Sequence, residues 1–152
     1  AVARKNHLAR NFIRLQKLFP SEYNFMPKTW ILPAEYNDFR LQFGKKQKAK
    51  TFIVKPEASC QGKGIFLIKK LEELSGGEHY VVQKYIHKPY LIENLKFDLR
   101  IYVLVAGCDP LRLFIFKEGL ARFATDNYKC PLSSNIDNMR MHLTNYAINK
   151  GR

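Results

Sequence analysis

The chain has 152 residues, 46% of them hydrophobic, which is enough for one domain or two small lobes with an apolar core. Its apolar runs are only a few residues long, and this excludes a membrane-spanning helix. The three cysteines are odd in number and form no CxxC pair, which argues against a disulfide framework or a zinc site. The 26 basic residues face only 13 acidic ones, and the net charge of +13 predicts an acidic partner: nucleic acid, an anionic membrane or an acidic protein tail.

The first predicted element is a basic helix. Apolar residues recur at helical spacing at Leu8, Phe12, Leu15 and Phe19, and Pro20 ends the pattern. We expect this helix to pack its apolar face on a core, although a transit peptide or a membrane-surface helix would share the pattern. The chain starts with Ala and ends without a terminal signal, so we also expect it to be a piece of a longer protein.

A short helix is predicted for residues 34–42, and a lysine run follows at residues 44–50. This run could be a nuclear signal or a polyanion contact, but such runs are more often solvated loops, and a loop is predicted here.

Strand-like sequence begins at residue 51 and continues with few interruptions. The predicted strands are TFIVK, GIFLIKK, YVVQKYI, KFDLRIYVLVAG and LRLFIFKEG, at residues 51–55, 64–70, 80–86, 96–107 and 111–119. The last two are expected to pair as a hairpin across a turn at residues 107–110, and LEELSGG at 71–77 is expected to be helical. The predicted class is α/β or α+β with a mainly antiparallel sheet.

The stretch KPEASCQGKGIF at residues 55–66 has the composition of a phosphate-binding loop but fits neither common pattern. A P-loop would need Gly at Glu57 and Ser or Thr at Gly64, and a dinucleotide loop would need Gly at Leu67. The loop also joins two strands, so no helix N-terminus is available to hold phosphate. Lys55 lies at the end of an apolar strand, before a proline, and this position favours a ligand-binding role for its ammonium group.

Charged residues alternate along one face of the strand that begins at residue 96. With a period of two, Lys96, Asp98 and Arg100 share a face, and the apolar residues of the other face are expected to form a hydrophobic wall. Exposed strands carry such charges for solubility, but Arg and Lys beside an acceptor carboxylate are also what an anion site requires. Past the hairpin partner, Lys117, Glu118 and Arg122 offer a second cationic group, with Gly119 permitting a turn or bulge; routine charges at an exposed turn are the alternative.

Several motifs, in order and spacing, resemble the tubulin tyrosine ligase-like family. These motifs are IVKP, CQGKGIF, VVQKYI, KFDLRIYVLV, GLARFAT and MHLTNYAINK. LFPSEYNFMPKTWILPAE and CDPLRLFIFKEGLARFAT look most like the polyglutamylase branch. The resemblance covers nearly the whole chain and implies an ATP-grasp fold, in which ATP lies between two lobes under a β-hairpin flap. It implies a partial catalytic domain over residues 1–152, with a central lobe near 20–86 and the start of a C-terminal lobe near 87–152.

The resemblance also implies roles for individual residues. ATP would be contacted by two sets of residues, from the flap and hinge and from the later motifs: Lys55, Gln61, Gly62, Gln83, Lys84, Tyr85 and Ile86, then Lys96, Asp98, Thr144 and Asn145. Arg100 would contact the terminal phosphate of ATP, and Arg122 would hold the carboxylate of the incoming amino acid, so these two are the expected catalytic residues. The protein or amino-acid substrate would be contacted by Gln61, Arg122 and Tyr146.

The implied reaction uses ATP to activate a glutamate side-chain carboxylate of tubulin, and the amine of free L-glutamate then forms the amide. Mg²⁺ is implied as well, but the family's metal-binding motif does not occur before Arg152. Metal ligands are therefore expected beyond this chain, none is assigned within it, and we expect the chain alone to be inactive.

The implied partners are acidic tubulin tails and free glutamate, and neither nucleic acid nor a membrane is expected. The protein is expected to be a monomer. Its expected location is the cytoplasm and cytoskeleton, with the cilium or basal body as a more specific site. Glycine or tyrosine ligation within the same family, and a non-catalytic basic microtubule-binding module, are the alternative functions.

Overall fold

The structure is a computed structural model, and it describes residues 4–44, 50–57, 63–75 and 77–150. Two compact units can be distinguished: Ala1–Lys88 with Cys130–Asp137, and Pro89–Lys129 with Asn138–Arg152. We call them unit 1 and unit 2 and describe each by itself. Their correspondence to the two predicted lobes remains a prediction. No helix in the described part is long and apolar enough to cross a membrane.

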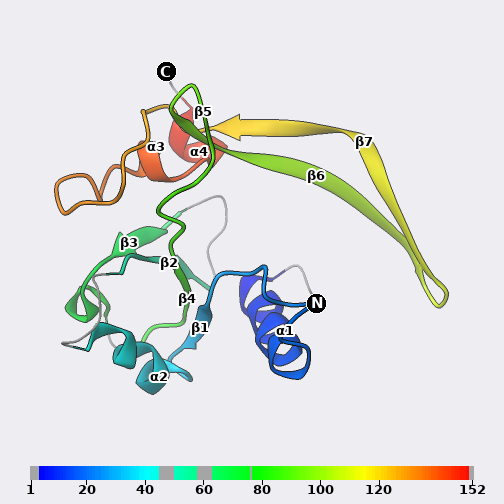
Figure 1. The fold of residues 1–152 in the computed structure, drawn as a ribbon, viewed down its shortest axis with the longest axis horizontal. Coiled ribbons are helices and arrows are strands. Elements are labelled where there is room, and N and C mark those ends of the chain that lie inside the picture. Colours follow the sequence, from blue (N-terminus) through cyan, green and yellow to red (C-terminus); the bar gives the residue numbers. More distant parts are fainter. Residues whose placement is uncertain (1–3, 45–49, 58–62, 76, 151–152) are drawn as a thin grey trace. The chain divides into compact units, whose positions relative to one another are not determined.

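Unit 1 is built on a four-stranded sheet in which every pairing is antiparallel (Figure 1). The strands lie in the order β1-β4-β2-β3, and they are β1 (Thr29–Leu32), β2 (Phe52–Pro56), β3 (Phe66–Ile68) and β4 (Tyr80–Lys84). The helical elements of unit 1 are α1 (Lys5–Leu18), α2 (Tyr36–Arg40), η1 (Leu41–Phe43) and η2 (Leu71–Glu73).

An aromatic core covers one face of this sheet. Trp30, Phe39 and Phe52 are almost fully buried and contact one another edge to face. The indole Nε1–H of Trp30 donates to Asp38 Oδ2 at 2.6 Å, so the one polar atom of that ring has a partner. Fully burying a side chain of this size contributes roughly 1.5–3 kcal/mol, so the core is the main stabilising feature of unit 1.

Unit 2 contains a three-stranded antiparallel sheet whose long hairpin is visible in Figure 1. Its elements are β5 (Leu91–Ile92), β6 (Leu95–Cys108), β7 (Leu111–Phe123), α3 (Met139–His142) and α4 (Tyr146–Asn149). Glu93 and Asn94 both have positive φ angles, of 51° and 62°, which is the geometry of a two-residue hairpin turn between β5 and β6.

The structure confirms the predicted class, because both sheets are antiparallel and are combined with helices. The predicted strands are present, the β6–β7 hairpin turns at Asp109 and Pro110, and helices occur at residues 36–40 and 5–18 as expected. The hairpin partner is longer than predicted. Lys117, Glu118 and Arg122 lie within β7 and not beyond it, because the ladder to β6 continues to Phe123.

Two predictions of burial are corrected. The residues of α1 that are buried are Asn6 and Ala9, while Leu8 and Phe19 of the predicted apolar face are 42% and 51% exposed. Phe12 instead contacts Tyr23, 6.0 Å away between ring centroids. The predicted apolar wall of β6 is exposed in the described structure, although its alternation with the charged face is as expected.

Candidate active site

Gly119 allows the two strands at the base of the hairpin to come close together. It pairs with Ile101, and the ladder shifts register immediately afterwards, which fits the predicted bulge. A Cβ atom at position 119 would lie 2.6 Å from the carbonyl oxygen of Arg100, closer than real Cβ contacts. A side chain at this position would therefore push β7 away from β6 next to the charged residues.

Asp98 is the centre of the charged cluster of unit 2. It faces Arg122 across the β6–β7 ladder, and Arg122 donates to both carboxylate oxygens, from Nε at 3.0 Å and from Nη2 at 2.6 Å. Arg100 Nη2 lies 3.3 Å from Asp98 Oδ2, and the Thr144 hydroxyl donates to the same oxygen at 2.9 Å. The predicted common face of Asp98 and Arg100 is thus present, and tertiary structure adds Arg122 and Thr144.

This arrangement leaves positive charge available for an anion. One carboxylate stands against two guanidinium groups, so the trio of Asp98, Arg100 and Arg122 has a net charge of about +1. Asp98 accepts from the Nε–Nη2 edge of Arg122, and the Nη1–Nη2 edge of the same guanidinium can still donate two hydrogen bonds to a second carboxylate. Arg122 is therefore held in one orientation by Asp98 while it keeps a binding edge.

Lys96 is positioned differently from the other members of the face. Its Nζ donates to the carbonyl oxygen of His142 at 2.8 Å, and His142 is fully buried with its ring against Tyr128. The lysine thereby links β6 to the segment that carries Thr144.

The segment that follows α3 is fixed by Asn149, a residue that sequence reasoning missed. Asn149 Nδ2 donates to the carbonyl oxygens of Leu143 and Asn145, and Asn149 Oδ1 accepts from both the backbone and the hydroxyl of Thr125. Its only signal in the sequence was its place within the motif MHLTNYAINK. Asn145 comes directly before α4, and Tyr146, at the start of α4, is 74% exposed.

In unit 1, Lys55 and Gln83 form a second polar cluster. Ile53 is opposite Gln83 in the β2–β4 ladder, and Lys55 Nζ donates to Gln83 Oε1 at 2.9 Å. Gln83 Nε2 donates to the hydroxyl of Thr29 at 2.9 Å, and that hydroxyl donates to Pro27 O at 2.8 Å. This chain of donors orients the Gln83 amide so that its oxygen faces Lys55. Sequence reasoning missed Thr29, because its position on β1 opposite Gln83 is set by strand pairing.

The ammonium group of Lys55 is in an environment that disfavours its charge. Burial lowers the pKa of Lys55 below its usual value of 10.5, and the positive charge of Lys5 lowers it further. Lys5 lies at the start of α1 and donates from Nζ to the carbonyl oxygen of Pro56 at 3.1 Å. An anion bound near Lys55 would offset both effects, so the group is suited to a phosphate ligand.

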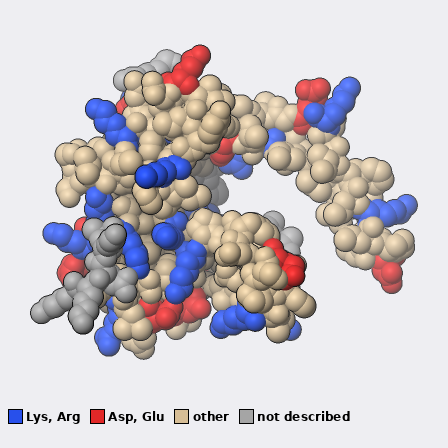
Figure 2. Space-filling view, in the orientation of Figure 1, with Lys and Arg blue, Asp and Glu red and all other residues tan. Residues whose placement is uncertain are grey.

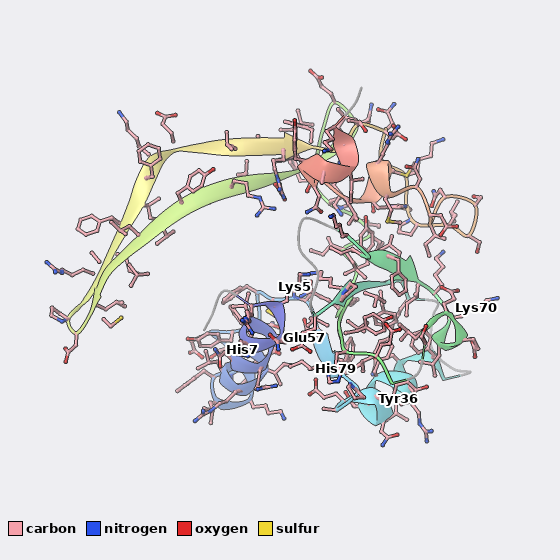
Figure 3. All side chains as sticks on the ribbon, turned by 180° about the vertical axis from the view of Figure 1, so that it is seen from behind. Lys5, His7, Tyr36, Glu57, Lys70 and His79 are labelled. Atoms are coloured by element: carbon pink, nitrogen blue, oxygen red, sulfur yellow. The ribbon has the colours of Figure 1, made fainter. Side chains whose placement is uncertain are left out.

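Further contacts join α1 to the base of the glycine loop. Asn6 Nδ2 donates to Glu57 Oε1. The imidazole Nδ1 of His79 lies 3.4 Å from Glu57 Oε2, and both of these residues are labelled in Figure 3. Gln61 and Gly62, the predicted flap residues, lie outside the described residues.

The predicted hinge residues span the end of β4: Gln83 and Lys84 are its last two residues, and Tyr85 and Ile86 follow it. The amide of Lys84 donates to Lys28 O at 2.8 Å and the amide of Tyr85 to Thr51 O at 2.9 Å. Tyr85 is buried, whereas Ile86 is 56% exposed. Their contact with adenine remains a prediction.

Metal binding has no support within the described part of the chain, where no three His, Cys, Asp or Glu side chains are grouped to hold an ion. The location of the Mg²⁺ ligands beyond residue 152 stays a prediction.

Comparison with known proteins identifies the family. The tubulin-tyrosine ligase family matches residues 1–152. The chain belongs to this family.

Curated relatives support the polyglutamylase branch. A probable beta-tubulin polyglutamylase of Tetrahymena thermophila is 62% identical over 99% of this chain and 13% of its own length. The human tubulin polyglutamylases TTLL13 and TTLL6 are 56% and 52% identical over 98% of the chain and 18% and 17% of their lengths. The chain thus spans less than a fifth of these relatives.

Among solved structures, the C-terminal domain of K. lactis Pby1, an ATP-grasp enzyme, is similar with a TM-score of 0.60 and 25% identity. The match covers 91% of this chain and 44% of that one. The predicted partial ATP-grasp fold is thereby supported for this member of the tubulin-tyrosine ligase family.

Proposed function

We propose that the protein containing this chain is an ATP-dependent ligase that adds glutamate to glutamate side chains of tubulin C-terminal tails. The observation that carries the proposal is the high identity to several tubulin polyglutamylases over nearly the whole chain. The charged clusters of the two units supply suitable chemistry. Gln83 accepts a hydrogen bond from Lys55 in unit 1, and Asp98 accepts two from Arg122 in unit 2, so both cations are held in place.

The proposed reaction has two steps that conserve atoms and charge. A side-chain carboxylate oxygen of tubulin attacks the terminal phosphorus of ATP, which releases ADP and leaves an acyl phosphate. The neutral amine of free glutamate then attacks the acyl carbon, phosphate leaves as the amide forms, and the phosphate takes up the proton that the amine loses. Mg²⁺, when bound, would screen the negative charge of the phosphates.

In this scheme, the residues of the chain position the substrates and stabilise the negative charge of the phosphates. Lys55 and Arg100 contact the phosphates of ATP and offset charge that develops on the transferred group. Lys96, Asp98, Thr144 and Asn145 contact ATP or hold the groups that do so. Arg122 uses its Nη1–Nη2 edge for the carboxylate of the incoming glutamate, and Tyr146 lies beside that amino acid.

Arg122→Ala in the full-length protein tests the amino-acid role. We expect glutamate incorporation into tubulin to fall by about 10- to 100-fold, since charge-assisted hydrogen bonds contribute roughly 1.5–3 kcal/mol. Arg112→Ala is a matched control, because Arg112 is an exposed arginine on the same strand. Equal activity of wild type and Arg122→Ala would refute the assignment.

A separate measurement tests the phosphate role of Lys55. ATP binding by Lys55→Ala should be at least about tenfold weaker than wild type. If both proteins bind ATP alike, Lys55 does not contact the phosphates.

Glycine or tyrosine ligation is the alternative within the family, and supplying each amino acid with ATP and tubulin distinguishes them. A non-catalytic microtubule-binding module would sediment with microtubules but incorporate none of the three amino acids.

We propose a cytoplasmic, cytoskeletal location for the protein. Its presence in cilia or basal bodies stays a prediction, as do its monomeric state and the inactivity of the chain alone.

A further inference from the structure

The end of β2 that carries Lys55 has fewer strand neighbours than the middle of β2. In the described structure, β3 pairs with β2 only as far as Val54, opposite Phe66, so that ladder does not reach Lys55. β4 continues on the other side, opposite Lys55 and Pro56. Pro56 has no N–H group to donate to a ladder. The backbone around Lys55 therefore needs support from elements other than strands.

The first turn of α1 lies beside this end of β2. Lys5 Nζ donates to the carbonyl oxygen of Pro56 at 3.1 Å, and Asn6 Nδ2 donates to Glu57 Oε1. Besides burial, the charge of Lys5 lowers the pKa of Lys55, so the two ammonium groups are near each other. Two consecutive residues of α1 thus contact the two residues that follow Lys55.

Glu57 is the residue that connects these elements. Its Oε1 accepts from Asn6, and its Oε2 lies 3.4 Å from Nδ1 of His79. Its backbone amide donates to the carbonyl oxygen of His79 at 3.1 Å. His79 comes directly before β4, and Lys5, Glu57 and His79 lie close together in Figure 3. One side chain therefore joins α1, the end of β2 and the start of β4.

The contact between Glu57 and Asn6 is specific in its geometry. Asn6 is buried, its Oδ1 accepts from the backbone amide of His7 at 2.8 Å, and its Nδ2 donates to Glu57. Turning the amide over would place its oxygen against the carboxylate, so these two partners fix its orientation. Because a buried amide without a partner is costly, Asn6 favours the arrangement in which Glu57 stays beside α1.

The carboxylate of Glu57 also supplies a charge that α1 itself lacks. In the described structure, α1 has no acidic residue in its first turn and no side-chain hydrogen bond at its N-cap. The first acidic residue of the sequence is Glu22, and Figure 2 shows Lys and Arg side chains over much of the visible face. Negative charge near the N-terminus of a helix is stabilising. Glu57 provides it from outside the helix, by its contact with the second residue of α1.

We propose that Glu57 is a positioning residue for ATP binding, which joins α1 to the end of β2 and thereby holds Lys55 in place. This proposal rests on the proposed function, in which Lys55 contacts the phosphates of ATP. Glu57 itself contacts no substrate and acts through Lys55. Since only β4 pairs with this end of β2 in the described structure, loss of the carboxylate lets the backbone of Lys55 shift, and a misplaced cation binds phosphate less well.

ATP binding by the full-length protein tests the contact between Glu57 and Asn6. Glu57→Ala should bind ATP about tenfold more weakly, because a displaced Lys55 loses part of its charged contact with phosphate. Asn6→Asp places two carboxylates against each other and should weaken binding by at least about tenfold. Asn6→Asp combined with Glu57→Gln exchanges the amide and the carboxylate, so binding should return to within about threefold of wild type. Both exchanged side chains keep their size, so this variant decides the question even where Glu57→Ala does not fold.

A second measurement shows whether Glu57 acts through Lys55. In the Lys55→Ala background, Glu57→Ala should weaken ATP binding by less than about twofold further, because the group that it positions is gone. In the ligation assay with tubulin, Glu57→Ala should raise the KM for ATP and change the KM for glutamate by less than about twofold. General damage to the fold would raise both KM values.

Glu73→Ala is the matched control. Glu73 is an exposed acid of unit 1 whose carboxylate accepts from the backbone amide of Lys69 at 3.2 Å, and its loss should change ATP binding by less than about twofold. Three results would each overturn the proposal. These are unchanged ATP binding in Glu57→Ala, an exchanged pair that binds no better than Asn6→Asp, and equal losses from Glu57→Ala with and without Lys55.

A failure of the proposed function gives a different pattern. If ATP binding follows the expected order of variants in a protein that incorporates no glutamate, the ligase activity is refuted and the positioning role is kept. If the protein incorporates glutamate and Glu57→Ala binds ATP like wild type, only the positioning role is refuted.

Discussion

The sheet of unit 1 and the β6–β7 hairpin are both rich in apolar residues, but they differ in what covers those residues. Phe52 and Val54 of β2 are fully buried, whereas Leu104 and Ile115 of the hairpin are 63% and 73% exposed. The sheet has an aromatic layer on one face from α2 and η1. An apolar strand thus becomes core only where another element of the described structure packs on it.

At the base of the hairpin, polar contacts provide the order that apolar packing provides in unit 1. Asp98 joins Arg100, Arg122 and Thr144, and the next stretch of β6 carries exposed apolar residues. The candidate catalytic residues of unit 2 are therefore held by hydrogen bonds and a close backbone approach more than by a surrounding apolar core.

The largest effect is expected when the stability of Phe52→Ala is compared with that of Ile115→Ala in the 152-residue chain. Phe52→Ala should lower the free energy of unfolding by about 3–5 kcal/mol, because it leaves a cavity in the core. Ile115→Ala should change it by no more than about 0.5 kcal/mol. Urea unfolding followed by the fluorescence of Trp30, the one tryptophan of the chain, measures both. Similar losses would mean that the hairpin is packed as tightly as the sheet.

Gly119→Ala tests the close approach at the base of the hairpin. The added Cβ would lie 2.6 Å from Arg100 O, and relief of the clash should cost about 1–3 kcal/mol. Hydrogen exchange of the β6 amides should become faster around Arg100. Gly107→Ala is the control, because its Cβ would meet Pro110 O at 3.2 Å and requires a smaller shift. The close approach is unimportant if the two variants exchange alike.

Thr29→Val examines a polar contact within the sheet of unit 1. The substitution removes the hydroxyl that accepts from Gln83 Nε2 and should destabilise the chain by about 1 kcal/mol. ATP affinity should also fall, since the amide oxygen of Gln83 is no longer held toward Lys55. Thr51→Val serves as a control at a partly buried threonine for which no side-chain hydrogen bond exists in the described structure. Unchanged ATP affinity in Thr29→Val would show that Gln83 needs no such support.

The smallest expected effect is a pH dependence that depends on Lys55. Because burial lowers the pKa of Lys55 below 10.5, the folded chain binds fewer protons than the unfolded chain between the folded pKa and 10.5. The free energy of unfolding of wild type, relative to that of Lys55→Met, should therefore rise as pH rises from the folded pKa to 10.5. This gain in stability should disappear as pH falls back to the folded pKa. Unfolding experiments from pH 7 to pH 10 check this, and a difference that falls with rising pH would contradict the cause given for the shift.

Local patterns predicted much of the fold and part of the site. Period-two alternation placed Asp98 and Arg100 on one face, and the structure has them in contact at 3.3 Å. The turn chemistry around Asp109 and Pro110 predicted the hairpin, which is present. The motifs of the chain predicted the family to which it belongs.

Contacts between distant residues could not be predicted in this way. The pairs Lys55–Gln83 and Asp98–Arg122 depend on strand register, and the paired residues are 28 and 24 positions apart in sequence. Thr29 and Asn149 have ordinary polar side chains, and nothing in their local sequence shows which backbone groups they will meet.

By itself, the sequence determined the strands, the alternation of their faces, the excess of positive charge and the family. Those properties follow from the order of neighbouring residues and from composition. Tertiary structure alone decided that Asp98 orients Arg122 and that Thr29 orients Gln83. The physical reason is that hydrogen bonds and burial depend on distances between segments, and strand pairing sets those distances only when the chain has folded.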